Sequence, residues 1–234
     1  HKLNFRFVLP DHSIRYMESC GTLIRNSQGM PQRIVVVSRD VTERMEKEDE
    51  IHNLAFYDSL TQLPNRRLLN DRLDQAMAVS KRSGRFGGLM FIDLDDFKPL
   101  NDMHGHSVGD LLLKEVARRI SGCVRETDTV ARFGGDEFVV VLSELDADRA
   151  ESLAQSGNAA EKIRAILAEP YVLKFRQEDD TETTIEYRCT SSIGVVLFKN
   201  HEAGTEDILR WADRAMYQAK DAGRNAIRYH ELKE

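Results

Sequence analysis

Carboxylates lie next to an apolar run at two separated places in this sequence. The run GGLMFIDL (87–94) leads into Asp95 and Asp96, and the stretch ARFGGDEFVVVL (131–142) sets two glycines and two acids before a run of branched aliphatic residues. Adjacent carboxylates repel one another unless a cation or a donor lies close, and glycines at a strand edge let a ligand approach the backbone. Both stretches therefore favour a ligand-binding site. The alternative is a Gly-Gly hairpin turn and a strand end whose acids are only solvated.

Asp93 and Asp136 are the residues in these stretches that suit metal binding. Asp93 lies at the carboxyl end of a predicted buried strand, where α/β sheets bind ligands, and Asp136 lies in a predicted hairpin. Carboxylates on facing strand ends can share hard cations, and Mg²⁺ is favoured where phosphate groups complete its shell. The pattern predicts cation-assisted chemistry on a phosphate compound.

The composition is that of a globular protein with enough length for one full domain and part of another. The chain has 234 residues, 41% of them hydrophobic, and 33 basic against 39 acidic side chains give a net charge of −6. Without a basic field, nucleic acid is not an expected partner. The odd number of cysteines predicts reduced thiols, and no apolar run approaches the roughly 20 residues that span a bilayer. We expect a cytoplasmic segment without a membrane span, and leave open an anchor upstream.

The elements before the first carboxylate stretch divide into strands and one helix. Residues 3–9, 13–25 and 33–41 alternate or run apolar and predict a three-stranded antiparallel meander. Three strands alone are marginally stable, so we expect them to be the tail of a larger domain. Residues 42–57 are rich in helix formers and predict a linker helix, whose short apolar seam leaves pairing with a second chain open.

Strands and helices alternate in the rest of the chain. This layout predicts an α/β (α+β) domain with a central sheet flanked by helices. The expected helices lie near 66–81, 106–124, 147–168 and 205–221, and the expected strands lie at 87–94, in the hairpin 131–142, and near 171–176, 183–198 and 225–230.

Four separated motifs, taken in order, resemble those of the GGDEF family of diguanylate cyclases. They are FIDLDDFKPLND, GHSVGD, RFGGDEF and AMYQAKDAGRN, and the resemblance runs from about Asp58 to His230. It implies a sheet similar to that of nucleotide cyclases and of the polymerase palm. It also implies an enzyme that condenses two GTP into cyclic di-GMP and two pyrophosphates.

The resemblance assigns catalytic and metal-binding roles. Asp93, Asp136 and the carbonyl of Leu94 would hold two Mg²⁺ ions, with Mn²⁺ as a possible substitute, and Asp136 would help to deprotonate the attacking 3′-hydroxyl. Lys98 would face the phosphates and complete the catalytic group. The role of Glu137 stays open.

The resemblance also assigns a GTP-binding surface. Asp110 would accept the N1 and N2 hydrogens of guanine, while the Asn101 amide would address O6 or N7. Each assignment has a structural alternative. Asn101 could cap a helix, and so could Lys220 and Arg224, while His106 could be a satisfied, partly buried imidazole. The remaining expected contacts are Phe97, His106, Lys220 and Arg224.

Arg125 and Asp128 resemble the RxxD element that this family places ahead of GGDEF. Arg can form two hydrogen bonds with a guanine edge or a phosphate, while Asp can accept hydrogen bonds from the opposite guanine edge. The pair would therefore bind cyclic di-GMP as a product inhibitor. A surface ion pair at a helix end is the alternative.

The expected organisation has three parts. Residues 1–41 resemble the C-terminal remnant of a PAS-like sensor domain, 42–57 form the helical linker, and 58–234 form the GGDEF diguanylate cyclase domain. Each chain would bring one GTP, so activity is expected to need a homodimer. The rival functions are a catalytically silent cyclic di-GMP receptor and a nucleotide cyclase of different base specificity.

Overall fold

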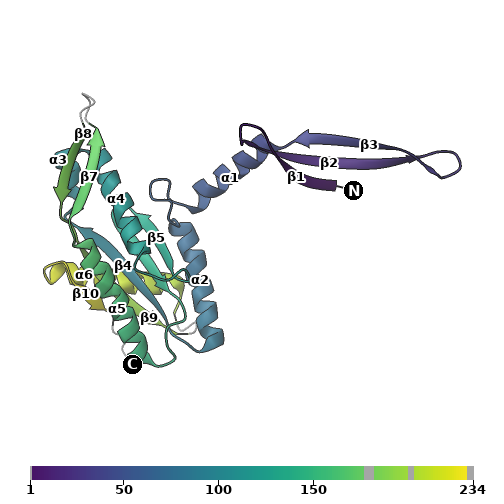
Figure 1. The fold of residues 1–234 in the computed structure, drawn as a ribbon. Coiled ribbons are helices and arrows are strands. Elements are labelled where there is room, and N and C mark those ends of the chain that lie inside the picture. The colour runs from purple at the N-terminus through teal and green to yellow at the C-terminus, as the bar shows by residue number, and fades with distance from the viewer. Residues whose placement is uncertain (1, 177–181, 200–202, 231–234) are drawn as a thin grey trace. The chain divides into compact units, whose positions relative to one another are not determined.

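The computed structural model describes residues 2–176, 182–199 and 203–230, and it divides into two compact units, His1–Ala55 and Phe56–Glu234 (Figure 1). No helix in these ranges is long and apolar enough to cross a membrane. The three cysteines are free thiols, as expected from their number.

The first unit contains the expected meander and helix. Strands β1 (Lys2–Val8), β2 (Ile14–Arg25) and β3 (Pro31–Asp40) pair antiparallel in the order β1-β2-β3, and α1 (Thr42–Phe56) follows. The Thr42 hydroxyl accepts a hydrogen bond from the backbone amide of Tyr16, which fixes the start of α1 to β2.

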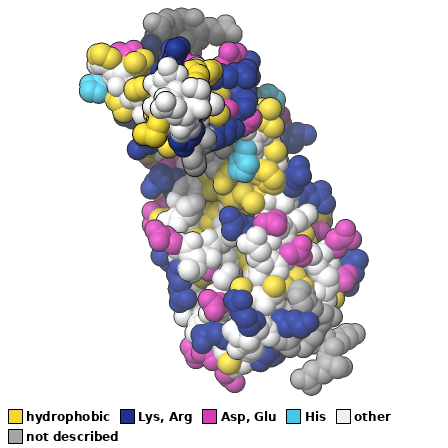
Figure 2. All heavy atoms as spheres, turned by 90° about the vertical axis from the view of Figure 1, so that its right-hand side faces the viewer, with side chains coloured by type: hydrophobic (Ala, Val, Ile, Leu, Met, Phe, Trp, Pro, Cys, Tyr) yellow, Lys and Arg dark blue, Asp and Glu magenta, His cyan; other side chains and the backbone are white. Residues whose placement is uncertain are grey.

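Apolar side chains of the first unit remain on its surface. Ile34 and Val37 are each 66% exposed, and β3 is exposed along its whole length. Hydrophobic side chains and Lys and Arg side chains are both visible on the face of the molecule that Figure 2 shows. A sheet of this kind is marginally stable by itself. That it belongs to a larger domain stays a prediction. Its assignment to a PAS-like domain stays a prediction.

The second unit is built on a five-stranded sheet in the order β10-β9-β4-β6-β5, in which only the β10/β9 pair is parallel. Its strands are β4 (Gly87–Asp95), β5 (Thr129–Gly134), β6 (Glu137–Leu142), β9 (Thr190–Phe198) and β10 (Ile227–Tyr229). Two further strands, β7 (Tyr171–Arg176) and β8 (Glu182–Tyr187), form a separate hairpin.

Helices cover both faces of this sheet, so the expected fold class is confirmed. The helices are α2 (Arg66–Ser83), α3 (Phe97–His104), α4 (His106–Ser121), α5 (Arg149–Leu167) and α6 (Thr205–Asp221) (Figure 1). Alternate residues of β4 face opposite sides. Leu89 and Phe91 pack in the core with α2 and α6, whereas Met90 and Ile92 pack in the core with α4 and α5.

Two sequence-based expectations were wrong. The single strand expected over 183–198 is two strands, because Tyr187 ends β8 in the hairpin with β7 and Thr190 begins β9 in the main sheet. Helix α3 was not expected at all. It is only eight residues long, and Pro99 lies in its first turn, where proline is tolerated because the amide there has no helical partner.

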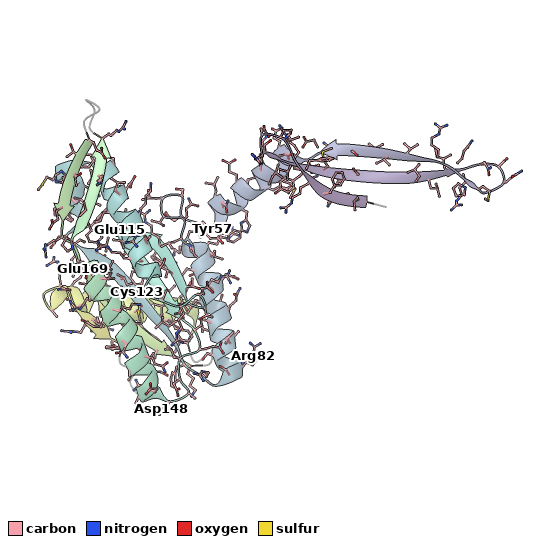
Figure 3. All side chains as sticks on the ribbon, viewed as in Figure 1. Tyr57, Arg82, Glu115, Cys123, Asp148 and Glu169 are labelled. Carbon is pink, nitrogen blue, oxygen red and sulfur yellow. The ribbon has the colours of Figure 1, made fainter. Side chains whose placement is uncertain are left out.

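Arg119 joins α4 to the end of α5. Its guanidinium donates to the carbonyl oxygens of Ile166 (2.9 Å), Glu169 (2.8 Å) and Pro170 (2.7 Å), and it lies 3.8 Å from the centre of the Tyr171 ring. Figure 3 labels Glu169 beyond the end of α5. One cation thus satisfies carbonyls that the end of a helix leaves without partners.

Helix α6 and strand β9 touch backbone to backbone at Gly194. A Cβ atom at this position would lie 2.0 Å from the carbonyl oxygen of Ala212 and 2.3 Å from the amide nitrogen of Met216. Backbone atoms on both sides leave no flexible group that can move away. Glycine is therefore required here by packing.

We predict that Gly194→Ala lowers the free energy of unfolding by about 2–3 kcal/mol, because the methyl group overpacks the contact between α6 and β9. Chemical denaturation measures this change. Gly122→Ala is the matched control, since its Cβ would have ordinary contacts of 3.6 Å, and it should change stability by less than about 0.5 kcal/mol. Equal stability of the two variants would contradict the prediction.

Candidate active site

The sheet register brings Asp93 and Asp136 to the same end of the sheet. Asp93 on β4 pairs with Glu137 on β6, and the Leu94 amide donates to the carbonyl oxygen of Asp136 at 3.3 Å. Asp136 lies in the hairpin turn beside Gly135, which has φ 51°. The two residues predicted as metal ligands are therefore neighbours in the structure.

The two glycines of the hairpin leave space beside these carboxylates. A Cβ atom added at Gly134 or at Gly135 would meet no atom within 4 Å. Gly134 also lacks a positive φ, so neither packing nor backbone conformation requires glycine there. The space beside the turn is open to a ligand.

The carboxylates at this end of the sheet carry more negative charge than the neighbouring cation neutralises. Burial raises the pKa of Asp93, the Lys220 ammonium at 2.7 Å opposes that rise, and Asp136 adds to it. Burial also raises the pKa of Glu137, and Asp93 and Asp136 raise it further. A cluster of this composition favours the binding of a further cation.

No group of three or more His, Cys, Asp or Glu side chains in the described ranges is arranged to hold a metal ion alone. Asp93 and Asp136 supply two carboxylates, and Leu94, whose side chain is buried in the core, can contribute only its backbone carbonyl. Mg²⁺ usually takes one or two protein carboxylates and completes its shell with phosphate and water. The donor set thus fits a metal that arrives with a phosphate compound.

Lys220 and Arg224, the predicted triphosphate-binding pair, lie beside acids of the β4 end. The Nζ atom of Lys220 is 2.7 Å from Oδ1 of Asp93, and Nε of the exposed Arg224 is 3.8 Å from Oδ1 of Asp96. These contacts place both cations near the carboxylate cluster. Their binding to phosphate stays a prediction.

Asp95 anchors the loop that carries Arg224, a role that the sequence analysis missed. This buried carboxylate accepts hydrogen bonds from Thr190 Oγ1 (2.7 Å), Ser192 Oγ (2.8 Å) and the Asn225 amide (3.0 Å). The spacing of Asp93 and Asp95 in a strand was an available signal, since residues two apart face the same side. Their different roles depend on long-range partners that spacing does not reveal.

The predicted guanine-binding residues lie on α3 and α4. The Asn101 Oδ1 atom is buried and has no hydrogen-bond partner among the described residues, whereas His106 and Asp110 are exposed and lie one turn apart on α4. A Cβ atom at Gly109 would lie 2.0 Å from Asn101 Oδ1 and 3.1 Å from Cζ of Phe97. Gly109 therefore lets α3 pack closely against α4.

These positions bear on the structural alternatives. The Asn101 side chain makes no capping bond through its oxygen, and His106 is exposed rather than a satisfied, partly buried imidazole. Lys98 is also exposed, and Phe97 is buried at the start of α3. The roles of these residues toward a nucleotide stay predictions.

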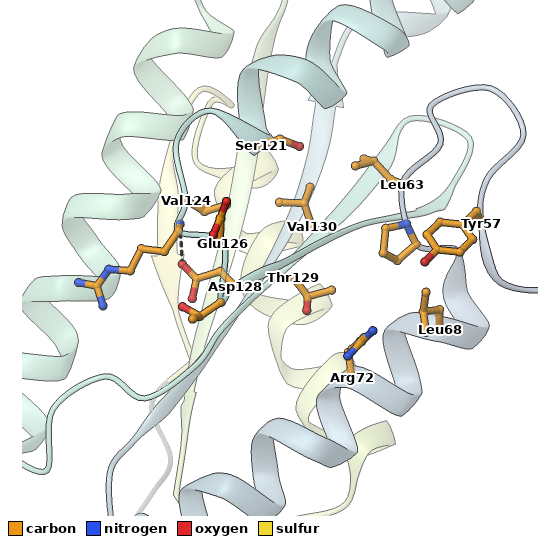
Figure 4. Close-up of a pocket in the computed structure, with 13 residues that line it drawn as sticks. Tyr57, Leu63, Leu68, Arg72, Ser121, Val124, Glu126, Asp128, Thr129 and Val130 are labelled. Atoms are coloured by element: carbon orange, nitrogen blue, oxygen red, sulfur yellow. Dashed lines mark hydrogen bonds between the residues drawn. The ribbon is translucent and has the colours of Figure 1, made fainter. Parts of the chain in front are cut away.

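Arg125 and Asp128 line a pocket of about 480 Å³, whose other walls include Tyr57, Leu63 and Arg72 (Figure 4). Asp128 accepts hydrogen bonds from the backbone amides of Arg125 (3.0 Å) and of Ser143 (3.1 Å). The aspartate thus has a structural function as well as a place in the pocket wall.

Arg132 joins the wall of this pocket to the hairpin turn. Its guanidinium donates to both carboxylate oxygens of Asp58 (3.0 and 3.1 Å) and to the carbonyl oxygen of Gly135 (2.7 and 3.0 Å). Burial would raise the pKa of Asp58, but hydrogen bonds from Thr61 and Arg132 outweigh it and lower the pKa. The sequence analysis missed this contact, because the two partners are far apart in the chain.

A largely antiparallel sheet with helices on both faces, and with carboxylates at the end of its central strands, defines an α+β domain. The model of the family described as "Diguanylate cyclase, GGDEF domain" matches residues 55–226. The chain therefore belongs to the GGDEF family, as its motifs predicted.

The curated bacterial relatives of this chain have names that refer to diguanylate cyclases and to cyclic di-GMP phosphodiesterases. The chain is 42% identical over 182 residues to the bifunctional diguanylate cyclase/cyclic di-GMP phosphodiesterase MucR of Pseudomonas aeruginosa, covering 78% of this chain and 24% of MucR. It is 38% identical over 180 residues to the diguanylate cyclase TpbB of the same species, covering 77% of this chain and 38% of TpbB. The chain thus spans less than half of these relatives.

Solved structures agree with the family. The GGDEF domain of TpbB from Pseudomonas aeruginosa matches with a TM-score of 0.62 and 38% identity, covering 74% of this chain and 99% of that one. The coiled coil and GGDEF domain of DgcB from Caulobacter crescentus, solved with cyclic di-GMP, matches with a TM-score of 0.66 and 28% identity, covering 80% and 92%.

We predict that Asp95→Ala lowers the free energy of unfolding by about 2–4 kcal/mol, because two hydroxyls and one backbone amide lose their acceptor. Urea denaturation is the measurement. Asp95→Asn should lose less of the free energy of unfolding than Asp95→Ala, since the asparagine side chain keeps one oxygen acceptor. Asp102→Ala, at an exposed position of α3, is the control and should change stability by less than about 0.5 kcal/mol. A loss no larger in Asp95→Ala than in this control would be incompatible with the anchor.

Proposed function

We propose that this chain is a Mg²⁺-dependent diguanylate cyclase, which condenses two GTP into cyclic di-GMP and releases two pyrophosphates. The observation that carries the proposal is the pairing of β4 with β6, which sets Asp93 beside the Asp136 turn and its open space. Membership of the GGDEF family supports it. Incubation with GTP and Mg²⁺, followed by mass spectrometry of the products, tests it directly.

Metal binding would use the donors that the β4 end supplies. Asp93, Asp136 and the Leu94 carbonyl would hold two Mg²⁺ ions, and Mn²⁺ has the same preference for oxygen ligands. Bound metal would neutralise phosphate charge and acidify the attacking hydroxyl. Lys220 is the cation beside Asp93 in this structure, and it would turn toward the triphosphate when a metal ion takes its place.

The chain's own residues would orient the nucleotide. Asn101 and Asp110 would contact guanine, with Phe97 and His106 beside them. Lys98, Lys220 and Arg224 would hold the phosphates through charge-assisted hydrogen bonds. Asp136 would accept the 3′-hydroxyl proton as the oxygen bonds to the α-phosphorus and pyrophosphate leaves.

A homodimer would complete the reaction, since each chain brings one GTP. Two domains related by a two-fold axis would set the 3′-hydroxyl of each nucleotide against the α-phosphorus of the other. The same bond change then occurs twice and closes the ring. Residues 1–41 would be the remnant of a PAS-like sensor, joined by 42–57 to the cyclase domain.

A cyclic di-GMP receptor without catalysis is the second candidate. The pocket beside Arg125 and Asp128 favours it, because binding there would not require the metal site. Some relatives, such as PdeR of Escherichia coli, are named cyclic di-GMP phosphodiesterases, but this chain spans only 26% of PdeR. Retention of both Asp93 and Asp136 favours catalysis.

We predict that Asp93→Ala and Asp136→Ala each lower cyclic di-GMP formation to less than about one hundredth of that of the unmodified protein, because metal ligands are lost. The product is quantified by chromatography, and circular dichroism checks the fold. Asp71→Ala, on an exposed part of α2, is the carboxylate control and should keep full activity. Normal turnover in either site variant would refute the metal assignment. ATP tested in parallel would reveal a cyclase of other specificity.

We predict that Arg125→Ala keeps the initial rate but removes product inhibition, because the residue lies in the pocket wall and makes no contact with Asp93 or Asp136. Progress curves should bend for the unmodified protein as cyclic di-GMP accumulates, and stay linear for the variant. Tight product binding to the variant in calorimetry would place the inhibitory site elsewhere.

A further inference from the structure

The β7/β8 hairpin reaches the site through one tyrosine. Tyr187 is the last residue of β8, and its hydroxyl donates to the carbonyl oxygen of Asp96 at 2.9 Å. Asp96 lies between the end of β4 and the start of α3. A hydroxyl from a separate hairpin thus fixes the junction between the metal-site strand and the helix that follows it.

This junction has an uncommon backbone conformation. Asp96 is the N-cap of α3 and has φ 57° and ψ 31°, in the left-handed region, and its side chain makes no capping hydrogen bond. Such a conformation in a residue other than glycine costs on the order of 1 kcal/mol and persists only where surrounding contacts hold it. The Tyr187 hydroxyl provides one such contact, and the Cys189 thiol, 3.2 Å from the Asp95 carbonyl oxygen, provides another.

The direction of α3 depends on this junction. The helix begins at Phe97 and carries Lys98 and Asn101, and it is only eight residues long. Phe97 and Leu100 pack in the core, and because the helix is short, a change at its first residue moves all its side chains together. Phe97 and Asn101 both pack near Gly109, and the Asp96 junction sets the direction from which the helix enters this packing.

We propose that Tyr187 is a positioning residue for GTP, which acts by holding the Asp96 junction and thereby the side chains of α3. This inference rests on the proposed function and deepens it, because no role in nucleotide binding follows from the motifs for a residue of the β7/β8 hairpin. Tyr187 acts through Asp96 rather than by touching the reacting atoms.

Tyr171 provides a matched control in the same hairpin. It is the direct cross-strand partner of Tyr187, and its hydroxyl also donates to a backbone carbonyl at 2.9 Å, that of Leu167. The Leu167 carbonyl belongs to the end of α5, not to the β4–α3 junction. Phenylalanine at either position removes one oxygen atom and one hydrogen bond of the same kind.

The experiment compares Tyr187→Phe and Tyr171→Phe with the unmodified protein. We expect Tyr187→Phe to raise the KM for GTP about fivefold with kcat within about twofold, since one positioning hydrogen bond is lost before the chemical step. Calorimetry with a non-hydrolysable GTP analogue should show the same loss of affinity. Tyr171→Phe should lower the melting temperature and leave the KM for GTP and kcat unchanged.

Two results would overturn the inference. One is an unchanged KM and analogue affinity in Tyr187→Phe, and the other is an equal change in both variants, which would mean that the hairpin only stabilises the fold. If the unmodified protein makes no cyclic di-GMP, the proposed function fails instead. The calorimetric comparison with the GTP analogue then still tests the positioning role.

Discussion

The position of β4 between β6 and β9 is the constraint on which the rest of the domain depends. All nine residues of β4 are buried, and the strand pairs along its length with β6 and β9. Side chains on its two faces pack in two separate cores, one with α2 and α6 and one with α4 and α5. Because both edges and both faces are occupied, only the ends of β4 can meet a ligand. The carboxylates lie at one of those ends.

That placement has an electrostatic cost that the surrounding residues offset in different ways. Asp95 accepts hydrogen bonds from two hydroxyls and from the backbone amide of Asn225, and the last of these holds the loop after α6. Asp93 is paired with the Lys220 ammonium, and burial still raises its pKa. Two buried acids separated by one residue therefore differ in function. The one with fully satisfied oxygens anchors the backbone, and the one with excess charge can recruit a cation.

Local patterns in the sequence predicted the helices and strands that carry long apolar periodicity, and α6 is a clear example because its expected and observed bounds agree. Helix α3 could not be predicted in the same way, since FKPLNDMH is short and contains a proline. The proximity of Asp93 to Asp136 was predictable from strand-end placement. The Arg132 contact with Asp58 was not, because the two residues are 74 positions apart and no local pattern pairs them.

Arg132 also links the wall of the pocket to the hairpin turn. Its guanidinium bonds to Asp58 and to the turn before Asp136, and its backbone amide bonds to the Pro64 carbonyl at 3.0 Å. Pro64 lines the pocket that contains Arg125. A ligand that displaces this wall must strain hydrogen bonds that also hold the hairpin turn. One side chain thus connects the segment before α2 to the hairpin turn that carries Asp136.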